Sequence, residues 1–286
     1  MFDEIDKREG FIAALDQSGG GSKRALSLYG INDYKDEDLF DLMHDMRERV
    51  IKSKSFTKDK ILGVILFEEE VERKIDGKDF TNYLLDKGMI PFVKIDRGLL
   101  EKENGVELMK DIPDLEFTLD KLKRYSVFGT KMRSVIYENN REGIRRIVKQ
   151  QFDLAKVIWK SGLVPILEPE VDIHALDKEE CEKTLKEEIL RELDLSYDMK
   201  VILKLSLPSI DNFYIDLINN DKVLKVLALS GGYSLDEASR KLSKNKGMIA
   251  SFSRALLEGL RVSQNDEEFD NILGESINKI YLASVK

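Results

Sequence analysis

The sequence has 286 residues, of which 46 are basic and 54 acidic, so its formal net charge is −8. This acidic balance argues against a general nucleic-acid or membrane-surface binder, and no apolar run approaches the roughly 20 residues of a membrane span. The length suits one α/β barrel or two ordinary domains. Because no Pro/Gly/Ser-rich linker divides the chain, we expect a single domain over residues 1–286.

The few cysteines and histidines bear on the cellular compartment of the protein and on whether it uses a metal ion. The first ten residues are charged, unlike a secretory signal, and the single cysteine, Cys181, favours a reducing cytoplasm. The two histidines, His44 and His174, have no neighbouring His or Cys at the spacing of metal ligands, which argues against a zinc mechanism, although carboxylates alone could hold Mg²⁺. We therefore expect neither a metal nor a cofactor.

Short apolar runs recur along the chain with amphipathic segments between them, an alternation typical of a parallel sheet. Eight such βα repeats in a chain of this length predict a single (β/α)₈ TIM barrel, in which the active site lies at the C-terminal ends of the strands. The predicted strands cover residues 11–16, 61–68, 90–96, 127–133, 163–170, 201–207, 223–230 and 248–253.

Two of the connecting helices illustrate the pattern. In residues 147–160, Val148, Phe152 and Ala155 share one helical face with Trp159, and we expect that face to pack on the barrel. Residues 177–194 predict a more polar helix, whose run of charges is expected to face solvent.

Lys204 lies within an apolar run, residues 201–208, that otherwise suits a strand buried on both faces. An ammonium group in such a strand loses hydration, which favours the neutral, nucleophilic amine. A buried lysine can equally be half of a structural ion pair. Two earlier strands also bring charged side chains to their C-terminal ends, an arrangement that favours a Schiff-base enzyme.

The twofold period of a strand predicts which of these side chains point into the barrel, because residues two apart share a face. We expect each such pair to face the C-terminal mouth. The pairs are Lys94 with Asp96, Lys131 with Arg133, Glu168 with Glu170, and Lys204 with Ser206.

Glycine and serine follow the first, seventh and eighth strands, where free backbone N–H groups could bind an anion. Asp16 ends the first strand and precedes the Gly-rich residues 17–22. The loops after strands seven and eight are the usual phosphate site of a TIM barrel, and we expect a helix to begin just after the eighth strand. The candidate residues in those two loops are Ser230, Gly231, Gly232, Ser251 and Arg254.

The protein is acidic overall, yet four of its basic residues are expected at one mouth of the barrel and would make that mouth positively charged. They are Lys94, Lys131, Arg133 and Arg254. An anionic substrate explains this gathering, and phosphates at both ends of the substrate would explain why several strands contribute. The alternative is that the cations neutralise the nearby carboxylates in a structural network. Both interpretations can hold together.

Eight segments carry a family resemblance, in order and from near residue 11 to near the end of the chain. Together they resemble the motifs of class I fructose-1,6-bisphosphate aldolase, most closely its short bacterial branch. The segments are AALDQSGG (13–20), GVILFE (63–68), KIDRG (94–98), KMR (131–133), VPILEPE (164–170), LK (203–204), LSGG (229–232) and SFSRAL (251–256).

The resemblance implies reversible, metal-independent cleavage of fructose 1,6-bisphosphate to dihydroxyacetone phosphate and glyceraldehyde 3-phosphate. Lys204 would form the Schiff base, Glu168 would act as general acid and base, and Lys131 would assist by its charge. Asp16 would position the C4 hydroxyl and help its deprotonation, and Glu170 would orient or tune the lysines. The resemblance further places Ser230, Gly231, Gly232 and Arg254, with Ser251 beside them, at the C1 phosphate, and Ser18, Lys94 and Arg133 at the C6 phosphate.

The chain departs from the animal members of this family in three places. Leu-Ser-Leu-Pro follows Lys204 where they have Pro-Asn, and Ser253 stands where a glycine is usual. Their terminal tyrosine, which exchanges the C3 proton, has only a weak counterpart in Tyr281. Residues 275–285 predict a helix with Tyr281 on its apolar face, so we expect this side chain to pack instead.

Two alternatives stay open from the sequence alone. One is another Schiff-base barrel aldolase acting on a related sugar phosphate, and the other is a non-catalytic barrel used as a binding protein. The substrates would be small sugar phosphates in each enzymatic case, with neither nucleic acid nor membrane as a partner. The sequence leaves the oligomeric state open, with a homo-oligomer as one option.

Overall fold

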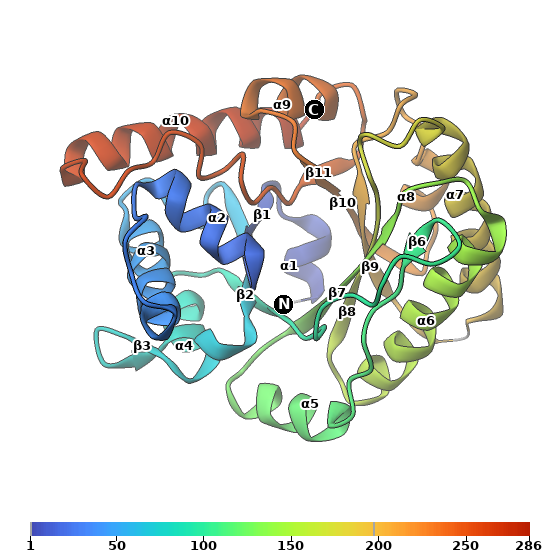
Figure 1. The fold of residues 1–286 in the computed structure, drawn as a ribbon, viewed down its shortest axis with the longest axis horizontal. Coiled ribbons are helices and arrows are strands. Elements are labelled where there is room, and N and C mark those ends of the chain that lie inside the picture. The colour runs from blue at the N-terminus through green and yellow to red at the C-terminus, as the bar shows by residue number, and fades with distance from the viewer. Residues whose placement is uncertain (1, 197) are drawn as a thin grey trace.

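The computed structural model describes residues 2–196 and 198–286, and its central element is a parallel sheet of eight strands rolled into a nearly closed barrel (Figure 1). The eight strands confirm the predicted barrel, with ends that shift by a few residues. In spatial and chain order they are β1 (Phe11–Leu15), β2 (Ile61–Phe67), β5 (Ile90–Lys94), β7 (Gly129–Ile136), β8 (Val164–Val171), β9 (Val201–Ser206), β10 (Val223–Leu229) and β11 (Met248–Ala250).

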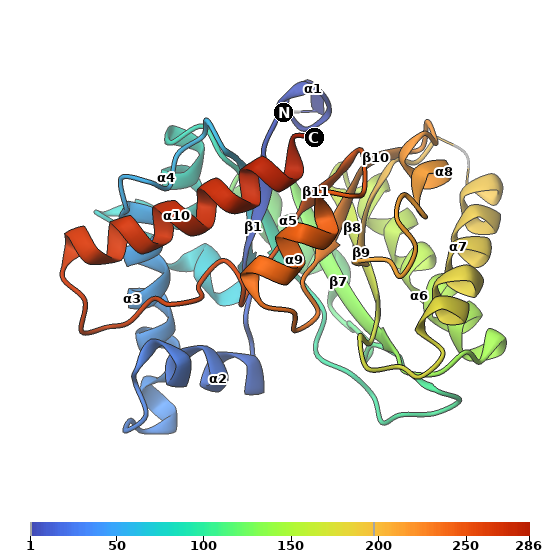
Figure 2. The same ribbon diagram turned by 90° about the horizontal axis from the view of Figure 1, so that it is seen from above.

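Helices follow each of these strands and surround the barrel (Figure 2). Three short strands lie outside it: β3 (Lys74–Ile75) pairs with β4 (Lys78–Asp79), and β6 (Val106–Glu107) adds to the end of β7. The helices are α1 (Phe2–Lys7), α2 (Gly20–Tyr29), α3 (Leu39–Lys52), α4 (Phe80–Asp86), α5 (Leu115–Arg124), α6 (Arg141–Lys160), α7 (Lys178–Leu195), α8 (Ile215–Ile218), α9 (Leu235–Leu242) and α10 (Asp266–Ser284), with 3₁₀ turns at Asp36–Asp38 and Glu68–Glu72.

The barrel closes between β1 and β11 through few direct bonds. The Ala14 N–H donates to the Phe252 carbonyl at 3.3 Å. Gln17 Nε2 donates to Ser253 Oγ at 2.8 Å, just beyond the ends of both strands. The loops that follow the first and last strands are therefore joined to each other directly at the C-terminal end of the barrel.

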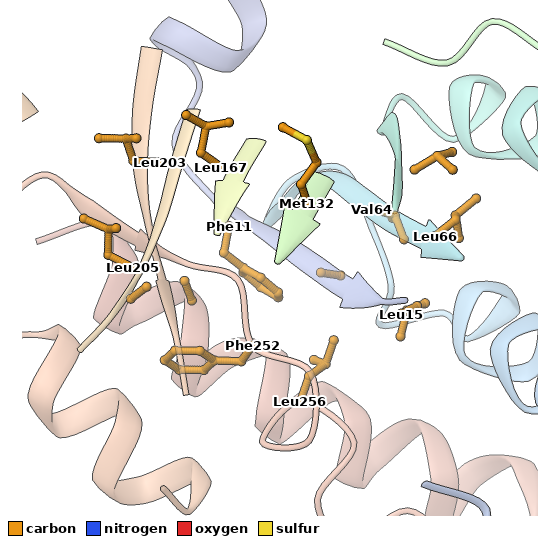
Figure 3. Close-up of a cluster of buried hydrophobic side chains, with 14 of the residues drawn as sticks. Phe11, Leu15, Val64, Leu66, Met132, Leu167, Leu203, Leu205, Phe252 and Leu256 are labelled. Carbon is orange, nitrogen blue, oxygen red and sulfur yellow. The ribbon is translucent and has the colours of Figure 1, made fainter. Parts of the chain in front are cut away.

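The two faces of the strands bury different apolar clusters, which fixes the direction of every side chain. The barrel interior holds Ile12, Phe92, Ile166 and Ile202, and Ile5 of α1 belongs to the same cluster. The outer face packs against the helices through a second cluster (Figure 3), which includes Leu167, Leu203 and Leu205. Because residues two apart share a face, the interior cluster directs the next inward position of each strand toward the C-terminal mouth.

Helices α6 and α7 test the two helix predictions. In α6 the predicted face is buried through Val148, Phe152 and Ala155, which is as expected. In α7 the solvated-face interpretation is wrong for Glu182, Glu188 and Glu192, whose side chains are buried. Glu188 lies between three arginines, of which Arg145 donates to it at 3.1 Å. Burial is tolerated here because guanidinium groups of α6 and α7 compensate the charge.

Over the residues that the structure describes, no helix is long and apolar enough to cross a membrane.

Candidate active site

A cavity of about 460 Å³ opens at the C-terminal end of the barrel, where the sequence predicts the site. It is lined by six basic and three acidic side chains, in a protein whose net charge is −8. The sequence assigns thirteen residues to catalysis or phosphate binding, and twelve of them line this cavity. They are Asp16, Ser18, Lys94, Lys131, Arg133, Glu168, Glu170, Lys204, Ser230, Gly231, Ser251 and Arg254.

Four charged side chains, three from strands and one from the residue that follows β1, meet at the bottom of the cavity. Lys131 Nζ of β7 lies 2.6 Å from Asp16 Oδ2 and 2.7 Å from Glu168 Oε2 of β8. Lys204 Nζ of β9 lies 3.0 Å from the other oxygen of Glu168. All four side chains are less than a tenth exposed. Glu168 therefore sits between the two lysines, with one carboxylate oxygen toward each.

Burial and charge act in opposite directions on the pKa values of this group. Burial raises the pKa of Asp16 and of Glu168, but the ammonium groups of Lys131 and Lys204 outweigh it and hold both below their usual range. Burial lowers the pKa of Lys131, but Asp16 and Glu168 outweigh it and raise the pKa above its ordinary value. At neutral pH both carboxylates are therefore ionised and Lys131 is charged.

Glu168 is placed to exchange a proton with the lysine amine. Its Oε1 lies 3.0 Å from Lys204 Nζ, within the reach that a general base requires. Its contacts with Lys204 and with Lys131 both have the length of ion pairs, and neither is aligned as a hydrogen bond. Lys204 is thus ion-paired with Glu168 in the resting protein. Glu168 is also the group best placed to accept the proton of Lys204.

Cations farther toward the mouth are divided between paired and unpaired groups. Lys94 Nζ lies 2.6 Å from Asp96 Oδ1, and Arg133 Nε donates to Glu170 Oε2 at 2.6 Å. Asp96 also accepts a hydrogen bond from the backbone N–H of Arg133 at 3.2 Å, so it links the end of β5 to β7. The structural network expected as the alternative therefore exists for these two cations.

Arg254 and Arg24 form the unpaired part of the cation set. In the described part of the chain neither guanidinium has a hydrogen bond or an ion pair. Burial, followed by the like charge of Arg24, lowers the pKa of Arg254. Two guanidinium groups that repel each other at the edge of a cavity are a candidate site for an anion. Sequence reasoning missed Arg24, although a basic residue on the helix after a Gly-rich loop was a visible signal.

The glycine pair after β10 permits a close approach to this corner. Gly231 and Gly232 have φ angles of +61° and +120°, which favour glycine. A Cβ built on Gly231 would lie 2.6 Å from Ile173 Cγ2, and one on Gly232 would lie 3.6 Å from Arg254 Nη2. Any other residue at position 231 would push Ile173 away, whereas at position 232 the left-handed φ disfavours other residues and a Cβ would make only an ordinary contact with the arginine.

Gly232 lines not the main cavity but an adjoining one of about 310 Å³, which also borders Arg24 and Arg254. Three other expectations about these strands and loops are wrong. The segment after β11 forms successive turns, not a helix that begins near Arg254. Part of the expected loop 17–22 is already the first turn of α2, which starts at Gly20. Asp96 and Ser206 face strand backbones and do not line the cavity.

Comparison with known proteins places this cavity in context. The family model described as fructose-bisphosphate aldolase class-I matches residues 5–206, more than two thirds of the chain. The chain belongs to this family. The match includes the strands that carry Asp16, Lys131, Glu168 and Lys204, and it agrees with the family resemblance of the sequence motifs.

Two solved aldolases share the barrel of this family member. One is the fructose-bisphosphate aldolase of Plasmodium falciparum, solved with TRAP and a small-molecule inhibitor; it is 19% identical, with 100% of this chain and 94% of that chain covered and a TM-score of 0.74. The other, from Slackia heliotrinireducens DSM 20476, is 13% identical, with 100% and 85% covered and a TM-score of 0.59. At these identities the likeness establishes the fold.

Tyr281 of this aldolase packs in the terminal helix, as predicted, and does not line the cavity. It belongs to α10 and packs against the outer apolar cluster. It also borders a surface hollow formed by Arg8, Lys58 and Gly88, which precede β1, β2 and β5. That hollow is therefore at the N-terminal end of the barrel, opposite the end that holds Lys204.

We expect Tyr281→Phe to leave C3 proton exchange in this aldolase within a few-fold of the parent, because only a hydroxyl at the wrong end of the barrel is lost. A positioned acid or base contributes about 10²- to 10⁴-fold, so the two outcomes are well separated. Detritiation of labelled dihydroxyacetone phosphate measures the exchange. A selective collapse of exchange with Schiff-base formation intact would show that the hydroxyl reaches the reacting carbon.

Proposed function

We propose that this chain is a metal-independent, Schiff-base-forming fructose-1,6-bisphosphate aldolase. The observation that carries the proposal is the buried group of Lys204, Glu168, Lys131 and Asp16 beneath a cavity with an excess of positive charge. The family match supports aldolase chemistry, and an amine next to its proton acceptor supports the imine route.

The chemistry follows from the contacts of these four residues. With Glu168 accepting its proton, the Lys204 amine adds to the C2 carbonyl carbon, and the carbinolamine loses water as Glu168 returns a proton to the departing oxygen. The protonated imine then withdraws electrons as the C3–C4 bond breaks, while Asp16 takes the proton of the C4 hydroxyl. Glyceraldehyde 3-phosphate leaves first. Protonation of the enamine at C3 and hydrolysis of the imine release dihydroxyacetone phosphate and restore the lysine.

Lys131 contributes a fixed positive charge to this sequence of steps. Its ammonium lies within 2.7 Å of both Asp16 and Glu168, and its pKa is raised, so it stays charged throughout. This charge keeps both carboxylates ionised and ready to accept protons.

The anion sites support a phosphorylated substrate. Arg24 and Arg254 flank the Ser230–Gly231–Gly232 turn and fit the C1 phosphate, while Ser18, Lys94 and Arg133 lie toward the C6 phosphate. Two buried polar atoms at the cavity, Ser251 Oγ and Gln17 Oε1, have no hydrogen-bond partner among the described residues. Buried polar atoms are normally paired, so a polar ligand is the expected partner.

The substrate assignment is tested by comparing cleavage of fructose 1,6-bisphosphate with that of fructose 1-phosphate. Lys94 and Arg133 already pair with Asp96 and Glu170, which favours the rival interpretation of a monophosphate aldolase. The bisphosphate should have the higher kcat/KM by at least about 10-fold, since a charge-assisted contact contributes about 1.5–3 kcal/mol. Equal values would favour the monophosphate enzyme, and no cleavage of either would favour the binding protein.

Arg254→Ala should weaken substrate binding by about 1.5–3 kcal/mol, because a charge-assisted phosphate contact is lost. It should also raise the inhibition constant of inorganic phosphate, measured in competition with the sugar. Arg240→Ala, which removes an exposed guanidinium from α9, is the matched control. Unchanged phosphate inhibition and unchanged kinetics in Arg254→Ala would remove this residue from the site.

Activity should survive prolonged EDTA treatment, because the protonated imine does the electron-withdrawing work that a metal ion does in metal-dependent aldolases. Among the described residues no three His, Cys, Asp or Glu side chains gather in a way that could hold a metal ion. The rate of cleavage before and after chelation is the measurement. Loss of activity that added Zn²⁺ restores would contradict the Schiff-base mechanism.

A further inference from the structure

The backbone ladder between the two strands that carry Lys204 and Glu168 ends at the site. Strand β8 pairs with β7 at eight positions, from Gly129↔Val164 to Ile136↔Val171. On the other side, β9 pairs with β10 as far as Leu229↔Ser206. Between β8 and β9, however, the pairs are Ile166↔Ile202 and Leu167↔Leu203 alone. The ladder ends one position before Glu168 and Lys204, so no backbone pair of this ladder lies at the positions of these two side chains.

Beyond the two charged residues, the side chain of Ser206 links β9 to β8. Its Oγ donates to the Val171 carbonyl at 2.6 Å and accepts from the Val171 N–H at 3.0 Å. Both residues are about 1% exposed, so no solvent replaces these bonds. One hydroxyl therefore takes the place of two missing bonds of the ladder, and it does so two residues after Lys204 on the same strand.

The hydrogen bonds of Ser206 and the Lys204–Glu168 ion pair both join β9 to β8. Only the hydrogen bonds of Ser206 can persist during a reaction. Once Lys204 Nζ bonds to a substrate carbon and Glu168 exchanges protons, their ion pair is broken or rebuilt at each step. The bonds of Ser206 to Val171 involve no reacting atom. They keep the same form in every intermediate.

We propose that Ser206 is a positioning residue, whose hydroxyl holds β9 against β8 so that Lys204 Nζ and Glu168 stay within proton-transfer distance while the imine forms. This inference rests on the proposed Schiff-base function. In the step concerned, the lysine nitrogen bonds to the carbonyl carbon and the carbonyl oxygen leaves as water. Removing the hydroxyl should misplace the amine relative to its proton acceptor, and misplacement of this kind costs up to about 100-fold in rate.

Ser284 provides a matched control elsewhere in the barrel. Its Oγ accepts from the Ala250 N–H at 3.0 Å and donates to the Ile280 carbonyl at 2.8 Å, and the side chain is buried. Ser284→Ala thus removes a doubly bonded, buried hydroxyl that also ties a strand in place. It should lower the melting temperature much as Ser206→Ala does, but it should leave the imine-forming step unchanged.

The experiment measures the rate at which borohydride-trappable imine forms at saturating dihydroxyacetone phosphate, per folded molecule, with competitive inhibition by inorganic phosphate as the measure of non-covalent binding. We expect Ser206→Ala to slow imine formation about 10- to 100-fold, with phosphate inhibition within about twofold of the parent. Cysteine is nearly isosteric with serine but is a weaker donor and acceptor. The rate of imine formation in Ser206→Cys should therefore lie between those of Ser206→Ala and the parent, and this variant is used for the test if the alanine variant does not fold.

Imine formation in Ser206→Ala and Ser206→Cys at the parental rate, or slowed no more than in Ser284→Ala, would overturn the role of Ser206 and leave the proposed function intact. Equal losses of imine formation and of phosphate binding would also overturn it, since they indicate general damage to the site. If the parent itself formed no imine, the proposed function would fail, and the role of Ser206 would fail with it.

Discussion

Lys204→Met should fold normally and lose essentially all cleavage of fructose 1,6-bisphosphate. Methionine is nearly isosteric and suits the apolar strand, and Glu168 keeps Lys131 as its counter-ion at 2.7 Å, so no buried charge is left without a partner. The chemistry has no substitute, because the other lysine at the base of the cavity, Lys131, is held as a cation by two carboxylates. We expect the loss to exceed about 10⁴-fold, as for removal of a covalent nucleophile.

The control for this variant is Lys225→Met. Lys225 lies near the start of β10, in register with Ile202, and does not line the cavity. Cleavage rates and thermal melting of both variants decide the matter. Substantial activity in a well-folded Lys204→Met protein would move the nucleophile to another residue.

Glu168→Gln should lower kcat by about 10²- to 10⁴-fold, the contribution typical of a general acid or base. The amide keeps the size of the side chain but can neither accept the proton of Lys204 nor deliver one to the departing water. Asp16 still pairs with Lys131 at 2.6 Å, so the fold should survive. Borohydride trapping should slow in parallel with cleavage, because the lost proton transfers belong to imine formation.

Glu188→Gln is the matched control, since Glu188 is also a buried, ion-paired glutamate but lies on α7, outside the cavity. Its activity should stay within a few-fold of the parent. A Glu168→Gln protein that forms imine at the parental rate would show that another group moves these protons.

The strands and their inward positions could be predicted because each rests on a local pattern. Apolar runs of five to eight residues with a twofold period were sufficient to place Lys131, Glu168 and Lys204 on the inner face, and the interior cluster with Ile166 and Ile202 accounts for it physically. A charged side chain within an apolar run could also be recognised from the sequence. A lysine flanked by leucines on a buried strand requires a partner or a function.

What could not be predicted depends on contacts between distant segments. The pairing of Arg133 with Glu170, which leaves Arg24 and Arg254 as the unpaired cations, follows from three-dimensional distances alone. The buried glutamates of α7 depend in the same way on arginines of α6. The role proposed for Ser206 arises from the early end of the ladder between two strands whose sequences look continuous. A twofold pattern predicts a face but not where a ladder stops.

The most direct test of the central claim is reduction of the protein with borohydride in the presence of dihydroxyacetone phosphate, followed by peptide mass mapping. We expect irreversible inactivation and a single labelled lysine, Lys204, with the label absent when the sugar phosphate or the borohydride is omitted. Label on Lys94, Lys131 or Lys225, or full retention of activity without label, would contradict the account.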